Sequence, residues 1–170
     1  EISSTQTSDV FDDTQINTVF ITTQHGSHSD LVIKGLKANK HVFVEKPLAV
    51  SFDQLSDIFK TCTELSAANK LPLLMVGFNR RFSPLTKKVK SIFKGAESRM
   101  VINIVMNAGH IPADVWVHDP KSGGGRIIGE GCHLIDLVAA FTESEVNMYP
   151  IPTGAFKTDL ILFNLAAIEP

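Results

Sequence analysis

The chain has 170 residues, of which 44% are hydrophobic and 20% are charged, and this balance excludes a mainly disordered protein. Its net charge is -2, from 16 basic and 18 acidic residues, and no block of Lys and Arg marks a surface for nucleic acid or for a membrane. The apolar runs are only a few residues long, whereas a helix that crosses a bilayer needs about 20. We therefore expect a globular protein with neither kind of partner.

The first half of the sequence alternates short apolar runs with amphipathic stretches, after a polar start over residues 1–15. The predicted elements are a strand at residues 18–22, a helix that ends at Asn39, a strand at 41–45, a long helix that begins at Asp53, and a strand at 71–78. This order predicts a parallel sheet that helices cover on both faces, as part of a doubly wound α/β domain.

The pattern changes after the third strand. Ser83-Pro84 predicts a helix start, because Ser caps a helix and Pro suits its first position. The predicted elements that follow are a strand at residues 99–107, a Gly-rich loop at 123–125, a helix from about Gly131 to Phe141 and a strand at 159–164. We place a domain boundary near Asn79, which separates residues 1–79 from residues 80–170.

The two cysteines and the two ends of the chain also carry information. Cys62 and Cys132 each lie in a helix-like pattern, and no C-x-x-C occurs, which favours a reducing compartment and a cytoplasmic protein.

The first residue is Glu1 rather than Met, and the chain stops at Pro170 soon after an apolar run. We expect from these ends that the chain is a piece of a longer protein.

Three motifs follow one another along the chain, and together they resemble a known family. They are Thr22-Thr23-Gln24-His25-Gly26-Ser27-His28, then Glu45-Lys46-Pro47, then Gly123-Gly124-Gly125 with Gly131-Cys132-His133-Leu134-Ile135-Asp136. In this order they are similar to the glucose–fructose oxidoreductase, inositol dehydrogenase and rhizopine-catabolism (Gfo/Idh/MocA) family. The resemblance extends from about Asp9 to about Phe141.

The resemblance implies a two-part architecture. Residues 1–79 would be the C-terminal part of a Rossmann-like NAD(P)-binding domain. Residues 80–170 would be part of an α+β domain with a mostly antiparallel open sheet that binds the substrate and forms a homo-oligomer. The resemblance also implies a dehydrogenase that transfers hydride between NAD or NADP and a carbon of a sugar, a sugar acid or a cyclitol.

One part of the family's cofactor site has no counterpart in this sequence. Members hold the pyrophosphate with a Gly-rich turn, because the backbone amides and a helix N-terminus bind phosphate there. No G-x-G-x-x-G occurs in the chain. The Gly-rich stretch at 123–125 is no substitute, since it follows no parallel strand and lacks the Gly-Lys-Ser/Thr of a phosphate loop. We therefore expect weak or absent cofactor binding by this chain alone.

Lys46 is the predicted catalytic residue at the end of the second strand, and a solvated Lys beside a turn Pro is the alternative. An ammonium there points into the crevice where such sheets bind ligands, and it would stabilise the alkoxide character of the reacting oxygen. The resemblance implies that the bond before Pro47 is cis. It also implies that the strand-end residues bind the cofactor. These residues are Thr22, Thr23, His25, His28, Glu45 and Pro47. A simple capping and turn role for the His25 loop is the alternative.

His133 is the predicted general base, because an imidazole titrates near neutral pH, and a His packed in a partly polar core is the alternative. Asp136, three residues further along the same helix, would orient that imidazole or contact the substrate. Many family members carry an Asp four residues before this His, where the chain has Gly129. Glu130 is no simple replacement, because adjacent helical residues point in different directions. The proton relay would then be His133 alone, or His133 with other help.

Further residues are candidates for the substrate. Arg80 and Arg81 would bind an anionic group with their planar guanidinium groups, although a surface pair at a domain boundary is equally expected. Trp116 and Lys121 precede the Gly-rich loop and would line a sugar pocket, with a packed Trp as the alternative. We predict no metal site, because the two histidines of the first motif have no third ligand in pattern.

A second functional class stays open from the sequence. The chain would be a catalytically incompetent piece that acts as an association module and binds no cofactor of its own. A partial Rossmann sheet leaves a strand edge without its neighbours, and such edges pair with other chains. Titration with NADH and NADPH separates the two possibilities.

Overall fold

The computed structural model describes residues 3–94, 102–106, 109–142, 146–150 and 163–167. The chain divides into two compact units. The first contains Glu1–Asn79 with Met106–His133, and the second contains Arg80–Val105 with Leu134–Pro170. The first unit therefore includes a segment beyond the boundary near Asn79. The cofactor and substrate roles of residues 1–79 and 80–170 stay predictions.

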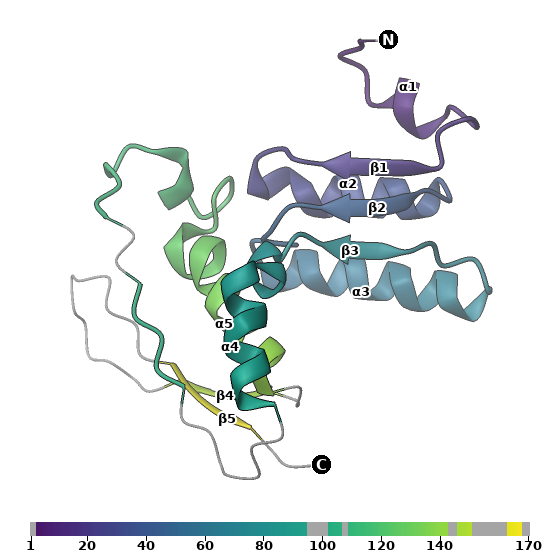
Figure 1. Ribbon diagram of the computed structural model, residues 1–170. Helices are drawn as coiled ribbons and strands as arrows, with labels where there is room; N and C mark the ends of the chain where they lie inside the picture. The colour runs from purple at the N-terminus through teal and green to yellow at the C-terminus, as the bar shows by residue number, and fades with distance from the viewer. Residues whose placement is uncertain (1–2, 95–101, 107–108, 143–145, 151–162, 168–170) are drawn as a thin grey trace. The chain divides into compact units, whose positions relative to one another are not determined.

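The first unit contains the predicted parallel sheet. Its strands are β1 (Thr18–Ile21), β2 (His41–Val44) and β3 (Leu74–Val76), in the spatial order β1-β2-β3. Both neighbouring pairs run parallel, and the three arrows in Figure 1 point the same way. β3 is shorter than the predicted run of 71–78. Pro72 explains the late start, because it has no N–H to give to a neighbouring strand.

Two helices connect these strands. They are α2 (His28–Lys37) and α3 (Phe52–Ala67), and they pack against each other. A Cβ added at Gly35 would lie 2.8 Å from Cγ2 of Val42, so this glycine allows α2 to approach β2 closely. The buried core between helices and sheet consists of Val19, Ile21, Val32, Leu36, Val42, Val44 and Ile58.

The prediction that helices cover both faces of the sheet is wrong for the described residues. α2 and α3 lie on the same face (Figure 1). On the other face Phe20 is 71% exposed and Met75 is 49% exposed, and the rings of Phe20 and Phe43 lie 5.2 Å apart. The reason is topological. β1, β2 and β3 follow one another in one direction, so two right-handed crossovers must place both helices on one side.

The ends of these helices follow local chemistry. The Ser51 side chain accepts a hydrogen bond from the Gln54 amide and caps the start of α3. Asn39 and Asn69 adopt left-handed φ angles of 57° and 54° after α2 and α3. Asparagine tolerates this conformation at a helix C-terminus, so the predicted end at Asn39 is confirmed. A short helix, α1 (Ser8–Phe11), precedes the sheet.

A 3-10 turn, Asn79–Phe82, contains the last residue of the first segment of unit one and the first residues of unit two, and helix α4 (Pro84–Phe93) follows it. The predicted start of α4 is confirmed, because the Ser83 hydroxyl accepts a hydrogen bond from the Thr86 amide. The remaining elements are helix α5 (Cys132–Thr142), whose first residues belong to the first unit, and the strands β4 (Val146–Pro150) and β5 (Phe163–Ala167). These two strands pair antiparallel.

The strand predicted at residues 99–107 is wrong where the structure describes it. Residues 102–106 form no strand, and Val105 is 95% exposed. An alternating pattern needs a hydrogen-bonded neighbour to become a strand, and no described strand pairs with this stretch. Residues 99–101 and 107 lie outside the described residues. The same holds for residues 159–162 of the last predicted strand, whose final two residues belong to β5.

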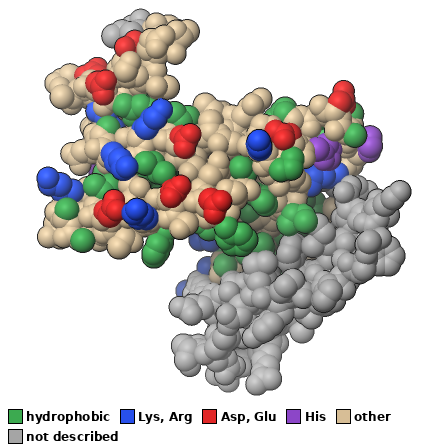
Figure 2. Space-filling view, turned by 180° about the vertical axis from the view of Figure 1, so that it is seen from behind, with side chains coloured by type: hydrophobic (Ala, Val, Ile, Leu, Met, Phe, Trp, Pro, Cys, Tyr) green, Lys and Arg blue, Asp and Glu red, His purple; other side chains and the backbone are tan. Residues whose placement is uncertain are grey.

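The surface agrees with the near-neutral composition. Figure 2 shows Lys, Arg, Asp and Glu interspersed with apolar side chains, without a field of one sign on the side in view. No helix within the described part of the chain has both the length and the apolar character that a bilayer crossing requires. The two thiols, Cys62 and Cys132, are free.

Candidate functional site

The candidate site lies in the first unit, where the three parallel strands end. β1 leads into Thr22 and Thr23, and β2 leads into Glu45 and Lys46. β3 leads into Gly77, whose amide donates to the Val44 carbonyl at 2.8 Å. The carboxyl ends of parallel strands meet at one edge of a sheet, and this edge is where open α/β sheets bind ligands.

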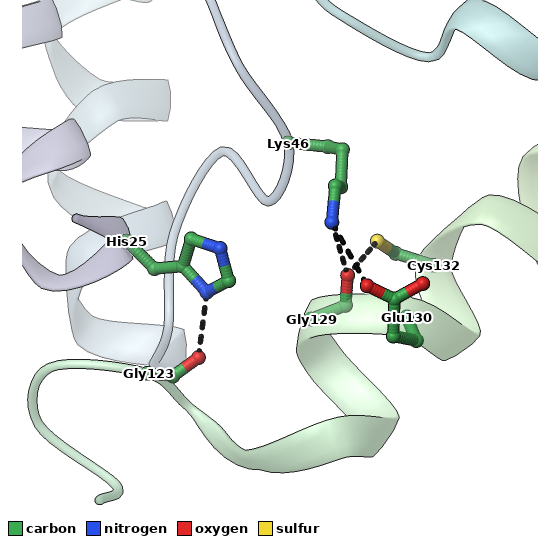
Figure 3. Close-up of polar contacts among 6 residues, drawn as sticks. All are labelled: His25, Lys46, Gly123, Gly129, Glu130 and Cys132. Atoms are coloured by element: carbon green, nitrogen blue, oxygen red, sulfur yellow. Dashed lines mark hydrogen bonds and ion pairs between the residues drawn. The ribbon is translucent and has the colours of Figure 1, made fainter. Parts of the chain in front are cut away.

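The Lys46 ammonium is held at this edge by two acceptors. Its Nζ donates to the carbonyl of Gly129 at 2.9 Å and to Oε1 of Glu130 at 3.2 Å (Figure 3). The exposed fractions of the Lys46 and Glu130 side chains are 17% and 33%. The bond between Lys46 and Pro47 is cis, as predicted. The ammonium is therefore directed to one place at the sheet edge.

The two acceptors belong to a π-helical turn, Ile127–Gly131, which leads into α5. The predicted helix, which begins near Gly131, leaves this turn out. Two glycines in an otherwise helical pattern, Gly129 and Gly131, mark an irregularity there but not its type. Single π-helical turns occur frequently at functional sites, because the extra residue redirects carbonyls and side chains.

The loop after β1 touches the Gly-rich loop directly. The His25 ring donates from Nδ1 to the Gly123 carbonyl at 2.8 Å, and the Gly26 amide donates to the Ser122 carbonyl at 2.9 Å. A Cβ at Gly26 would lie 2.2 Å from the Lys121 carbonyl oxygen, so only glycine fits there. The Gly-rich loop has the same need for glycine, because a Cβ at Gly123 would lie 2.3 Å from the Val117 carbonyl oxygen, and Gly124 and Gly125 both have a φ of 76°.

His25 is the first residue of a short 3-10 helix, His25–Ser27, and both burial and nearby charges act on its imidazole. Partial burial lowers the pKa of its imidazole below the ordinary value, and the charges of Lys46 and His28 act in the same direction. The hydrogen bond to Gly123 and the charge of Glu130 oppose this shift. The Gly123 carbonyl also fixes the proton on Nδ1, so the neutral ring presents Nε2 as an acceptor. Trp116 meets the ring edge-on at 4.9 Å.

The lowered pKa of His25 predicts a loss of stability in mild acid. Below the ordinary value of 6.5 the unfolded chain takes up a proton that the folded ring still resists. The free energy of unfolding should therefore fall as the pH drops through 6.5 toward the lowered pKa. Urea unfolding at pH 7.5 and pH 5.5 measures this, and His25→Gln should reduce the difference between the two. His110→Gln, which changes an exposed histidine, is the control and should keep the wild-type difference between the two pH values. The prediction is contradicted if His25→Gln keeps the wild-type difference as well.

His28 is completely buried between the two strand-end loops. Its Nδ1 lies 2.8 Å from the Pro47 carbonyl and its Nε2 lies 2.9 Å from the Thr23 carbonyl. Both ring nitrogens are thus engaged with the backbone, and the ring has no exposed surface for a ligand. Thr22 and Thr23 are exposed, and the Thr23 hydroxyl pairs with that of Ser27 at 2.7 Å.

His133 lies in the first turn of α5, on the same segment as Gly129 and Glu130. Its ring is 5% exposed and meets the ring of Phe78, which follows β3, edge-on at 6.1 Å. The neighbouring Cys132 thiol donates to the Gly129 carbonyl at 3.7 Å, and burial raises the pKa of this thiol to about 11. Cys132 is consequently protonated at neutral pH and is no nucleophile.

Two of the predicted substrate contacts, Arg81 and Asp136, bind each other within the second unit. The guanidinium of Arg81 donates from Nε to Oδ2 of Asp136 at 3.0 Å and from Nη2 to Oδ1. The Asp136 side chain is only 8% exposed. This forked ion pair occupies the groups that would otherwise meet a ligand. The Arg80 carbonyl accepts from the Thr86 hydroxyl at 2.8 Å.

The remaining predicted residues lie in the first unit. Trp116 is 38% exposed in a 3-10 turn, Trp116–His118, and Lys121 is exposed in the loop that follows. Glu45 lies along the backbone after β3, since its Oε1 is 3.3 Å from a Cβ built at Gly77. Within the described residues no three His, Cys, Asp or Glu side chains gather as metal ligands. The structure thus brings the strand-end residues together with the turn that precedes α5.

The chain is similar to known proteins in sequence and in fold. Residues 2–71 match the sequence model of a family described as an oxidoreductase family with an NAD-binding Rossmann fold. The chain is 30% identical over 141 residues to YrbE, an uncharacterized oxidoreductase of Bacillus subtilis. This alignment covers 81% of the chain and 39% of YrbE. The chain is also 38% identical over 82 residues to the myo-inositol 2-dehydrogenase of Thermotoga maritima. This alignment covers 48% of the chain and 23% of that enzyme.

A solved structure of an NAD-binding protein has a similar fold. The crystal structure of an NAD-binding protein from Listeria innocua superposes with a TM-score of 0.67 at 29% identity, over 85% of this chain and 41% of that one. The chain therefore spans between 23% and 41% of the length of these proteins. The resemblance drawn from the three motifs is confirmed, and residues 2–71 belong to the NAD-binding Rossmann part of the Gfo/Idh/MocA oxidoreductase family.

Proposed function

We propose that the protein that carries this chain is an NAD(P)-dependent dehydrogenase acting on a hydroxyl of a sugar, a sugar acid or a cyclitol, or on the matching ketone. The observation that carries this proposal is the Lys46 ammonium at the carboxyl edge of the sheet, fixed by the Gly129 carbonyl and Glu130. An ammonium in this place stabilises negative charge on a reacting oxygen. His133, on the segment that holds Lys46, takes or returns the hydroxyl proton.

The residues at the sheet edge suit the nicotinamide end of the cofactor. Thr22 and Thr23 present exposed hydroxyls after β1, and Glu45 presents a carboxylate after β2. Hydroxyl and carboxylate groups are the partners that ribose hydroxyls and an amide require. The bound nicotinamide supplies hydride acceptance or donation. The buried His28 ring supports this site, because its nitrogens lie against the carbonyls of Thr23 and Pro47 in the two strand-end loops.

The substrate part of the proposal rests on the relatives and on the residues that the sequence predicts as substrate contacts. The named relative from Thermotoga maritima acts on myo-inositol, which makes myo-inositol the first substrate to test with NAD⁺ and NADP⁺. Arg81 and Asp136 support the architecture of the second unit rather than the ligand, because they bind each other. Trp116, Lys121 and Arg80 remain the proposed contacts to the substrate. We also propose that the second unit forms a homo-oligomer.

The reaction is tested in the complete reading frame that contains this chain. Reduction of NAD⁺ or NADP⁺ at 340 nm with myo-inositol, or with a panel of aldoses and their acids, would support the proposal. No reduction with any polyol, in a protein that binds NADH, would remove the dehydrogenase assignment.

The 170-residue chain alone is expected to bind NADH weakly or not at all. The chain has no G-x-G-x-x-G, so the amides that hold the pyrophosphate are missing. Titration with NADH and NADPH, followed by cofactor fluorescence, should give no saturable change. Micromolar binding would contradict this prediction and would assign the complete cofactor site to this chain.

A second candidate function is supported by the open face of the sheet. Phe20 and Met75 are exposed there beside Phe43, and an apolar surface of this kind favours contact with another protein surface. The chain alone would then act as an association module. Sedimentation of the chain over a range of concentrations separates this function from the first, since an isolated monomer excludes it.

A further inference from the structure

Glu130 has no role in the proposed reaction so far, although it is the carboxylate beside the Lys46 ammonium. Residues 46 and 130 lie 84 positions apart, yet Nζ of Lys46 is 3.2 Å from Oε1 of Glu130. The Glu130 side chain is one third exposed and that of Lys46 is 17% exposed. The pair is therefore shielded on the Lys46 side and open to water on the Glu130 side.

Position 129 carries no side chain to compete with Glu130. A Cβ built on Gly129 would lie 3.3 Å from Cε1 of His25, so a side chain there would crowd the imidazole. Gly129 contributes its carbonyl to Lys46 instead, at 2.9 Å. The π-helical turn places this carbonyl and the next side chain on the same ammonium, which a regular helix would not do for adjacent residues.

We propose that Glu130 is the positioning carboxylate of Lys46, which holds the ammonium at the sheet edge together with the Gly129 carbonyl. This inference rests on the proposed function, because the position of the ammonium matters only if it meets the reacting oxygen. Without the carboxylate, Lys46 keeps one acceptor and a long flexible side chain, and a misplaced group loses much of its catalytic effect. Glu130 touches no reacting atom and acts through Lys46.

Acylation of Lys46 tests the contact without any activity assay. The 170-residue chain is treated with an acetyl N-hydroxysuccinimide ester at fixed pH, and mass spectrometry measures the rate at each lysine. Glu130→Gln should label Lys46 about two- to fivefold faster, the factor that a partly exposed ion pair provides. Glu64→Gln, the matched loss of an exposed carboxylate on α3, should leave the rate unchanged. Exposed Lys60 serves as the internal reference.

The His25 ring provides a second reporter in the same samples. The charge of Glu130 raises the pKa of this imidazole, so Glu130→Gln should move the NMR titration of His25 to lower pH. Glu64→Gln should not move it. If the amide spectrum of Glu130→Gln shows an intact fold, then wild-type labelling of Lys46 together with an unmoved His25 titration overturns the proposal.

Kinetics in the active protein separate positioning from a merely structural role. Glu130→Gln should lower kcat by about ten- to a hundredfold with little change in KM, and Glu130→Asp should recover part of that loss because it restores the charge. An unchanged kcat in Glu130→Gln overturns the proposal. A wild-type protein without activity refutes the proposed function, whereas the labelling and titration results still decide whether Glu130 holds Lys46.

Discussion

Replacing Lys46 by Met is expected to lower the rate of hydride transfer in the active protein by about a hundred- to a thousandfold. The removal of one preorganised donor at a developing oxyanion has effects of this size. Met keeps most of the side-chain volume and loses only the ammonium that the Gly129 carbonyl and Glu130 hold in place. The loss should appear in kcat, because the ammonium acts on charge that develops in the transition state.

Stopped-flow measurement of NADH formation with myo-inositol, at saturating NAD⁺, gives the rate directly. Lys60→Met is the matched control, because Lys60 is an exposed lysine on α3 away from the site. Both variants should unfold in urea at nearly the same midpoint as the wild type, since a partly exposed ion pair contributes little to stability. Near-wild-type turnover of Lys46→Met would exclude Lys46 from the mechanism.

Elements that depend on local chemistry could be read from the sequence. The apolar runs at β1 and β2 predicted strands within one residue of their ends, and Asn39 predicted the end of α2. Ser83 predicted the start of α4. In each case a short-range preference, for burial or for a cap, agrees with the tertiary structure.

Features that depend on distant parts of the chain could not be read in this way. The contact between Lys46 and Glu130 needs a π-helical turn, and no spacing rule predicts that turn from Gly129 and Gly131 alone. The fork between Arg81 and Asp136 is a second example. Each of them looks like a ligand-binding residue in isolation, and only their pairing across 55 positions shows that they bind each other.

The faces of the sheet show the same limit at a larger scale. Alternating strands and helices predicted a sheet covered on both sides. Helices lie on both faces only if the direction of the strand order reverses within the sheet. The three described parallel strands follow one another in one direction, β1-β2-β3. Phe20 and Met75 are the visible result, since their apolar side chains fit a buried strand but are exposed here.

His28→Leu is expected to give the largest loss of stability among the site residues, about 1–3 kcal/mol in the free energy of unfolding. The ring is completely buried, and its two nitrogens lie against the carbonyls of Thr23 and Pro47. A neutral imidazole has one N–H, which donates to one of these carbonyls, whereas leucine fills most of the space but has no donor and leaves that carbonyl without a partner. Urea unfolding of the 170-residue chain measures the change.

The two carbonyls belong to the loops after β1 and β2, so the same substitution should also loosen the site. Hydrogen exchange of the Glu45 and Ser27 amides, which donate to the Ile21 and Gln24 carbonyls, should accelerate in His28→Leu more than exchange in α3, because these segments lose their common anchor. His110→Leu is the control, since His110 is an exposed histidine. Equal stability of the two variants would show that His28 does not join the loops. The predicted loss would instead make His28 the buried support on which the positions of Thr23 and Lys46 both depend.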